Sequence, residues 1–196
     1  MEYSAASVKF LLWYVETKET AKLLQDHTFD EIKEMVFTEN LYQQRSKARQ
    51  QSEFSCIKKR LESIPDELTR LLVKADIQTA KLITFIACMA TERLLFEMVY
   101  EIYRNKIKYG EKSILDADLN VFFQDKREQN EKIAGFSDET IRKLKQTFSK
   151  YMAEAGLISG KGTEKMIEHP YIDWSMRDTL FRNHMEKYWY AITGEM

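Results

Sequence analysis

The sequence predicts a mainly α fold of about seven helices, with helix-turn-helix-like and winged-helix-like parts and one or two short β-hairpins. Turn-forming residues are scarce, because the 196-residue chain holds only 6 Gly and 2 Pro. Sandwiches and barrels need many tight turns, so this composition favours helices. Apolar residues make up 44% of the chain and recur at helical spacing along most of it. Such a chain is long enough to bury one core, or two small cores packed together.

Two helices are predicted at the start of the chain. The first has apolar residues at helical spacing, namely Val8, Leu11, Leu12 and Val15. Ser4 or Ser7 is a suitable N-cap for it, because a serine hydroxyl accepts a hydrogen bond from a free backbone N–H at a helix start. Thr28 followed by Glu31 is a capping-box pattern, which opens a second helix that ends near Phe37.

Three further helices are predicted from the middle of the sequence. The third begins near Ser46 and has its apolar face at Phe54, Ile57, Leu61 and Ile64. Pro65 fits the start of a fourth helix over residues 66–74. Asp76 can cap a long fifth helix that runs to about Lys106 and is apolar over most of its circumference. A helix of that kind is usually central to its domain.

The last third of the sequence predicts two capped helices, then a hairpin, and then a final helix. Asp116 or Asp118 can cap a sixth helix. Ser137 caps the next, and Gly156 is a plausible terminating residue for it. The apolar pairs 157–158 and 166–167 then flank a Gly-containing turn, which is typical of a short hairpin with a basic tip. A last helix follows from about residue 173.

Composition also indicates the compartment. The longest charge-free apolar run lies between Lys81 and Glu92 and holds ten residues, whereas a membrane-spanning helix needs about 20. The N-terminus has no basic region followed by an apolar stretch and a cleavage site, so a secretory signal is not expected. We expect a soluble cytoplasmic protein with reduced thiols and no membrane partner.

Signals for catalysis, metal binding and cofactors are weak. The three histidines, His27, His169 and His184, lie in unrelated contexts without a second ligand at metal-binding spacing. Cys56 and Cys88 lie on apolar helical faces, where a packing role is the usual one. We therefore expect that this protein is not an enzyme and that it has no catalytic residues, no metal site and no cofactor.

A cluster of basic residues stands out on a chain whose net charge is -1. Residues 41–60 hold six basic residues and one acidic residue. The candidates for phosphate contacts among them are Arg45, Lys47, Arg49, Lys58 and Lys59. They follow a short helix and a turn, in the order of a helix-turn-helix, and Arg and Lys neutralise phosphates. A charge run is more often an ordinary solvated surface, and that alternative stays open.

A second basic set lies in residues 137–163. A helix followed by a short hairpin is the order of elements in a winged helix. Arg142, Lys143, Lys145 and Lys150 lie off the apolar stripe of the predicted helix and therefore face water or a phosphate backbone, and Lys161 lies at the hairpin tip. The candidates for a second nucleic-acid contact are Arg142, Lys143, Lys145 and Lys161. An ordinary amphipathic helix followed by a turn would have the same pattern, so this alternative also stays open.

Several separated segments together resemble the BrxA family of BREX phage-defence systems. These segments span nearly the whole chain and are residues 3–5, 39–42, 57–61, 136–144 and 154–158. The resemblance implies a small, mostly helical accessory protein of a defence system, similar to DNA-binding modules with winged-helix-like parts. It also implies no catalysis by this subunit, since other members of such systems carry the methyltransferase and ATPase activities.

Two hypotheses follow for the function. The first is non-catalytic, largely sequence-independent binding of double-stranded DNA within a defence assembly, through the two basic sets. The second is a helical adaptor that docks other BREX proteins through an exposed apolar patch, with Trp174 and Trp189 as its candidate residues. We expect an N-terminal helix-turn-helix-like part over residues 1–75. A C-terminal helical part is expected over residues 76–196, with a winged-helix-like unit at 116–170, unless the two form one compact unit.

Overall fold

The N-terminal part of the molecule contains only helices. The structure is a computed structural model that describes residues 2–195. Its first five elements are the 3₁₀-helix η1 (Ala6–Lys9) and the α-helices α1 (Tyr14–Leu23), α2 (Phe29–Thr38), α3 (Lys47–Glu62) and α4 (Asp66–Lys74). The capping box of Thr28 and Glu31 is confirmed at the start of α2, as is the Ser46 cap of α3. Helix α4 begins directly after Pro65, as predicted.

The first predicted helix is interrupted. The Ser4 hydroxyl accepts a hydrogen bond from the backbone N–H of Ala6 at the start of η1, whereas Ser7 lies within η1 and caps no helix. The chain leaves η1 in an extended conformation at Phe10, and Trp13 then takes a left-handed conformation with φ of 53° before α1 begins. No Gly or Pro marks this break. The carbonyl oxygens of Leu11 and Leu12 instead accept hydrogen bonds from the buried Arg60 guanidinium, so a distant residue stabilises the extended segment.

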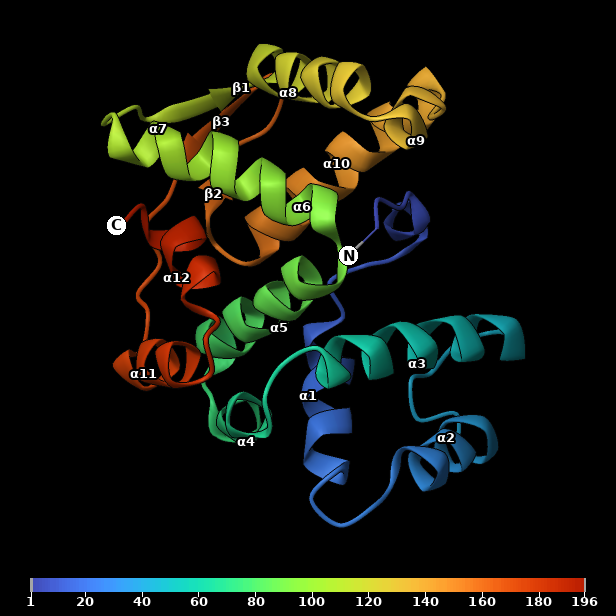
Figure 1. The fold of residues 1–196 in the computed structure, drawn as a ribbon. Coiled ribbons are helices and arrows are strands. Elements are labelled where there is room, and N and C mark those ends of the chain that lie inside the picture. The colour runs from blue at the N-terminus through green and yellow to red at the C-terminus, as the bar shows by residue number, and fades with distance from the viewer. Residues whose placement is uncertain (1, 196) are drawn as a thin grey trace.

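Helix α5 (Ile77–Thr91) lies at the centre of the molecule, between the upper and lower layers in Figure 1. Asp76 caps it, as predicted. The long helix expected to reach Lys106 is, however, broken at Glu92, which has φ of -124° and ψ of 95°. Three shorter segments follow, namely α6 (Arg93–Met98), the π-helix η2 (Val99–Tyr103) and α7 (Arg104–Lys108). Among residues 2–195, no helix is long and apolar enough to span a bilayer.

A small antiparallel sheet forms within residues 113–167. Its strands are β1 (Ser113–Leu115), β2 (Ile158–Ser159) and β3 (Glu164–Ile167), and the helices between them are α8 (Asp116–Gln129), α9 (Glu131–Ala134) and α10 (Asp138–Glu154). The predicted hairpin is confirmed, because Ile158 pairs with Ile167 and Ser159 with Met166. Strand β1 was not predicted; it pairs with β3, so the order in the sheet is β1-β3-β2.

The C-terminal segment folds into two helices instead of one. Helix α11 (Trp174–Arg182) begins at the Asp173 cap, and α12 (Glu186–Thr193) follows after a left-handed residue, His184, with φ of 56°. The turn lets α12 pack against both α11 and η2. Interruptions of this kind in the first, fifth and last predicted helices explain why the structure has more helices than the seven expected.

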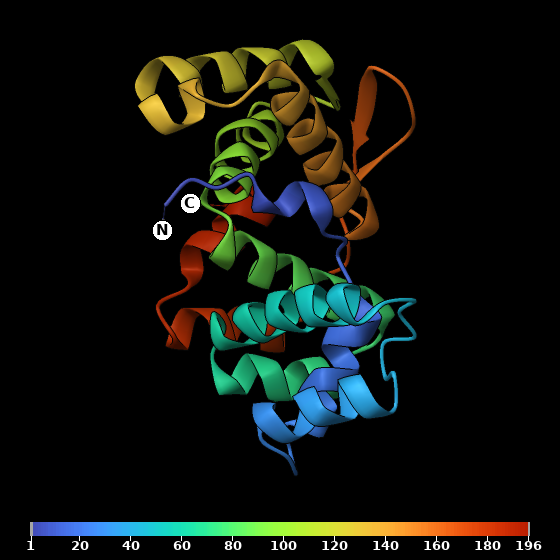
Figure 2. The same ribbon diagram turned by 90° about the vertical axis from the view of Figure 1, so that its right-hand side faces the viewer.

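The two predicted parts of the chain share one buried cluster of apolar side chains. Figure 2 shows η1 beside α10, and η1 packs against α10. Arg60 of α3 also donates a hydrogen bond to the Tyr151 hydroxyl of α10, over 3.4 Å. The N-terminal helices therefore pack against α10. The predicted division of the chain into two parts at residue 75 stays a prediction.

Candidate nucleic-acid interface

Helix α10 is the longest helix of the described residues, and its amphipathic pattern determines which residues reach solvent. The Ser137 hydroxyl accepts a hydrogen bond from the backbone N–H of Thr140, which confirms the predicted cap. Gly156 ends the helix with φ of 77°. The buried face consists of Ile141, Leu144, Phe148, Tyr151 and Met152. Polar and cationic residues therefore occupy the opposite face.

The β2–β3 hairpin projects beside this polar face. Its turn contains Gly160 and Gly162, both with φ of 89°, a conformation that an L side chain rarely adopts. Lys161 lies between them and is exposed. Lys165 of β3 donates a hydrogen bond to the Gly162 carbonyl oxygen and so ties the turn to the strand. The hairpin thus presents an exposed lysine at an ordered tip.

A groove of about 500 Å³ separates α10 from this hairpin. We call it the basic groove, because its lining includes five cationic residues and one acidic residue, Asp116. The cationic residues are Arg142, Lys145, Lys150, Lys161 and Lys165. Three of them were predicted as site residues. Lys150 was placed off the apolar stripe but was not among the predicted site residues, and Lys165 was not predicted.

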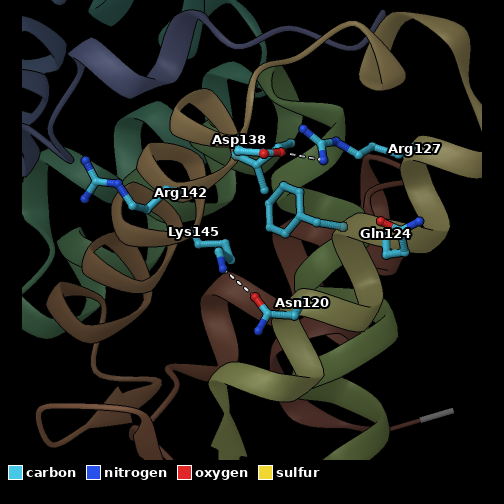
Figure 3. A pocket seen from close by; sticks show the side chains of 8 residues that line it. Asn120, Gln124, Arg127, Asp138, Arg142 and Lys145 are labelled. Carbon is cyan, nitrogen blue, oxygen red and sulfur yellow. Dashed lines mark hydrogen bonds and ion pairs between the residues drawn. The ribbon is translucent and has the colours of Figure 1, made fainter.

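A second, smaller hollow of about 250 Å³ adjoins the basic groove between α8 and α10. Figure 3 shows that Arg127 points toward Asp138 and that Lys145 points toward Asn120. The Arg127 Nη1 atom lies 2.8 Å from the Asp138 carboxylate, and the Lys145 ammonium donates a hydrogen bond to Asn120. These contacts join the two helices, so Arg127 and Lys145 also fix the wall of the groove.

Ion pairs reduce the charge available from two predicted residues. Arg142 and Lys143 both contact Glu139, at 2.7 Å and 3.3 Å. Hydrogen bonds from Arg142 and Lys143 lower the pKa of Glu139 to about 2, so this carboxylate stays ionised at neutral pH. Lys150 and Lys161, in contrast, make no ion pair or side-chain hydrogen bond with residues 2–195. They are the cations of the groove best placed to meet an external phosphate.

The N-terminal basic set does not line this groove. Within the described part of the chain, Arg45 and Lys47 make no ion pair, while Lys58 lies 3.8 Å from Glu62. Arg49 donates to the Lys9 carbonyl oxygen and stacks over a Trp ring. Lys59 lines a separate hollow of about 550 Å³ whose walls include acidic residues. The structure thus brings Arg142, Lys145 and Lys161 of the C-terminal set to one groove, whose lining does not include Lys143. It spreads the N-terminal set over several environments.

Arg60 belongs to the basic cluster in sequence but is only 2% exposed. Its guanidinium lies near the rings of Trp13 and Tyr151, at 5.7 Å from each ring centroid. Composition alone could not distinguish it from its exposed neighbours Lys58 and Lys59. The distinguishing signal is helical phase, because Arg60 follows Phe54 and Ile57 on the buried face of α3.

The cysteines are poor nucleophiles in this fold. Burial raises the pKa of Cys88 to about 12 and also raises the pKa of Cys56. Both thiols are therefore protonated at neutral pH. Across residues 2–195, no group of three or more His, Cys, Asp and Glu side chains is arranged to hold a metal ion.

The fold and the basic groove define a mainly helical protein with a cationic surface between a long helix and a hairpin. The chain belongs to the BrxA family, which it matches over residues 1–184. It is 34% identical over 163 residues to "BREX protein BrxA" of Bacillus cereus (strain H3081.97), with 83% of this chain and 82% of that protein covered.

A solved structure has the same fold. The crystal structure of an uncharacterized protein from Magnetospirillum magneticum superposes with a TM-score of 0.85, covering 100% of both chains at 20% sequence identity. At this identity the likeness concerns the fold alone.

Proposed function

We propose that this protein is a non-catalytic component of a BREX phage-defence system and that it binds double-stranded DNA through the basic groove. Membership of the BrxA family supports the assignment to a BREX system. The observation that carries the proposal of DNA binding is the gathering of five cationic side chains around one groove between α10 and the hairpin. Cations grouped in this way neutralise backbone phosphates and release counterions.

The order of the elements supports a winged-helix mode of binding. Strand β1, helices α8 and α10, and the β2–β3 hairpin follow one another, with β1 and β2 on either side of β3. In such units the second long helix enters the major groove, which is about 12 Å wide. The hairpin, with Lys161 at its tip, would then contact the adjoining phosphates. Arg45 and Lys47 remain candidates for a further contact with the same duplex.

The proposal is tested by measuring the affinity for a duplex at several salt concentrations. If about five phosphates are engaged, log affinity should fall with log salt at a slope of about -4 to -5. In the double variant Lys150→Ala/Lys161→Ala, the slope of log affinity against log salt should be shallower by about 2, and binding should weaken equally for duplexes of every sequence. Fluorescence anisotropy with a labelled 25-base-pair duplex measures both quantities.

A matched control removes the same charge elsewhere. Lys22 of α1 and Lys74 of α4 are exposed, and both helices lie in the lower part of the molecule, away from α10 (Figure 1). Lys22→Ala/Lys74→Ala should leave the affinity and the slope unchanged. Absence of binding at low salt, or equal losses in the two double variants, would contradict DNA binding by the groove.

The alternative function is a protein adaptor that contacts other BREX proteins in the cytoplasm. An exposed aromatic patch favours it, since Tyr171 is 77% exposed and Trp174 is 66% exposed. Trp189, the other candidate for this patch, is only 4% exposed and packs inside the molecule, so that part of the prediction is wrong. If the adaptor hypothesis holds, Trp174→Ala should abolish co-purification with a BREX protein and leave DNA affinity unchanged.

A further inference from the structure

One stripe of α10 faces the basic groove along most of the length of the helix. Arg142, Gln146, Ser149 and Ala153 all line the groove, and their spacing of four, three and four residues keeps them on one side of a helix. Lys145 and Lys150 flank the stripe. Two uncharged polar residues therefore occupy its centre, between cations.

Gln146 and Ser149 have free hydrogen-bonding groups. Within residues 2–195, neither side chain makes a hydrogen bond. Such groups add nothing to the neutralisation of phosphates. The glutamine amide both donates and accepts, which matches the N6 and N7 edge of adenine, and a serine hydroxyl can pair with several base edges.

The first turn of α10 is poorly suited to approach DNA. It carries Asp138 and Glu139, and the Asp138 side chain is 94% exposed although it pairs with Arg127. Exposed carboxylates repel phosphates, so a duplex would approach the middle of the helix more closely than its start. The middle of the helix is where Gln146 and Ser149 lie.

We propose that Gln146 and Ser149 read base edges in the major groove and make DNA binding selective for sequence, with adenine as the base preferred by Gln146. This inference rests on the proposed function. It goes further than phosphate binding, because it assigns specificity to two residues that carry no charge. The cations on either side fix the position of the duplex, and the central pair distinguishes among sequences.

The experiment selects duplexes from a randomised pool with the full-length protein and then compares the best duplex with a scrambled one. We expect the unmodified protein to bind the selected duplex at least about tenfold more tightly. Gln146→Ala should reduce the ratio of the affinity for the selected duplex to the affinity for the scrambled duplex at least about fivefold, because the preference at one base pair is lost. Ser149→Ala should cause a smaller reduction. In both variants, affinity for the scrambled duplex should stay within about twofold of that of the unmodified protein. The slope of log affinity against log salt should stay unchanged.

The variants are expected to fold, because Ala is the best helix former and both positions face solvent or the groove. Gln25→Ala, an exposed glutamine beyond the end of α1, is the matched control and should retain the full ratio. Tight binding without any enriched sequence would overturn this inference and leave the proposed function intact. An enriched sequence that Gln146→Ala and Ser149→Ala bind as selectively as the unmodified protein would also overturn it. Failure to bind any duplex at low salt would overturn both proposals.

Discussion

Glu53 of α3 is a fully buried residue whose two carboxylate oxygens have no hydrogen-bond partner within residues 2–195. Burial and the charge of Glu16 on α1 together raise the pKa of Glu53 to about 7, although the charges of Arg49 and Arg60 and the nearby Gln44 side chain act in the opposite direction. A carboxyl group in such surroundings is most stable when it is protonated.

The stability of the protein should therefore depend on pH through Glu53. Because the pKa is raised from 4.5 to about 7 on folding, this group favours the folded state below pH 4.5, and the benefit is lost as the pH rises through 7. Glu53→Gln should increase the free energy of unfolding by about 3 kcal/mol at pH 8 and by less than about 1 kcal/mol at pH 5. Urea denaturation at both pH values measures the difference. An equal effect at pH 5 and pH 8 would contradict this account.

At the scale of the element, the first turn of α10 limits the positive charge that this helix offers to DNA, at Arg142 in the basic groove and at Lys143 beside it. Glu139 holds Arg142 and Lys143 by ion pairs. Glu139→Gln should free both cations, so DNA affinity should rise several-fold at low salt and the salt slope should steepen by about 1 to 2. Anisotropy titrations at several salt concentrations test this expectation. Glu34→Gln on α2 changes an exposed glutamate and should leave the slope unaltered; an equal change in both variants would contradict it.

The capped helix starts are the elements that sequence predicts best. Thr28, Ser46, Asp76 and Ser137 each accept a hydrogen bond from a backbone N–H at a helix start. The side chain and the N–H lie two or three residues apart, so the signal is local. The break at Glu92, in contrast, has no Gly or Pro near it, so no local sequence pattern marks it.

The same distinction applies to the candidate site. The cations of α10 and the hairpin tip were predicted because amphipathic spacing and a Gly-containing turn are local patterns. The groove between α10 and the hairpin was not predicted, because it depends on how the hairpin packs against α10. Strand β1 pairs with β3 from a position about 50 residues earlier in the chain, and a strand of 3 residues is too short for its alternation to be recognised.

At the scale of the whole molecule, Arg60 joins the N-terminal helices to α10. Its guanidinium donates to the Leu12 and Leu11 carbonyl oxygens over 2.7 Å and 3.0 Å and also reaches the Tyr151 hydroxyl. Removing it would leave the carbonyl oxygen of the buried Leu12 without a donor. Arg60→Ala should lower the free energy of unfolding by about 3 kcal/mol or more, as measured by urea denaturation, whereas Lys47→Ala on the exposed start of α3 should change it by less than about 0.5 kcal/mol.

The molecule has two basic sets, and DNA titrations can tell whether one duplex contacts both. Among residues 2–195, the members that make no ion pair and no side-chain hydrogen bond are Arg45, Lys47 and Lys59 of the first set and Lys150 and Lys161 at the groove. Lys59 lines a separate hollow. If both sets meet the same duplex, Arg45→Ala/Lys47→Ala should lower the steepness of the salt slope by about 2, and the fourfold variant should lower it by about 4. If only the groove binds, the first pair of changes should have no effect and the fourfold variant should match Lys150→Ala/Lys161→Ala. The second result would remove α3 from the interface and leave α10 and the hairpin as the whole contact. The slope of log affinity against log salt supports this conclusion because it reports the number of phosphates neutralised, wherever the cations lie.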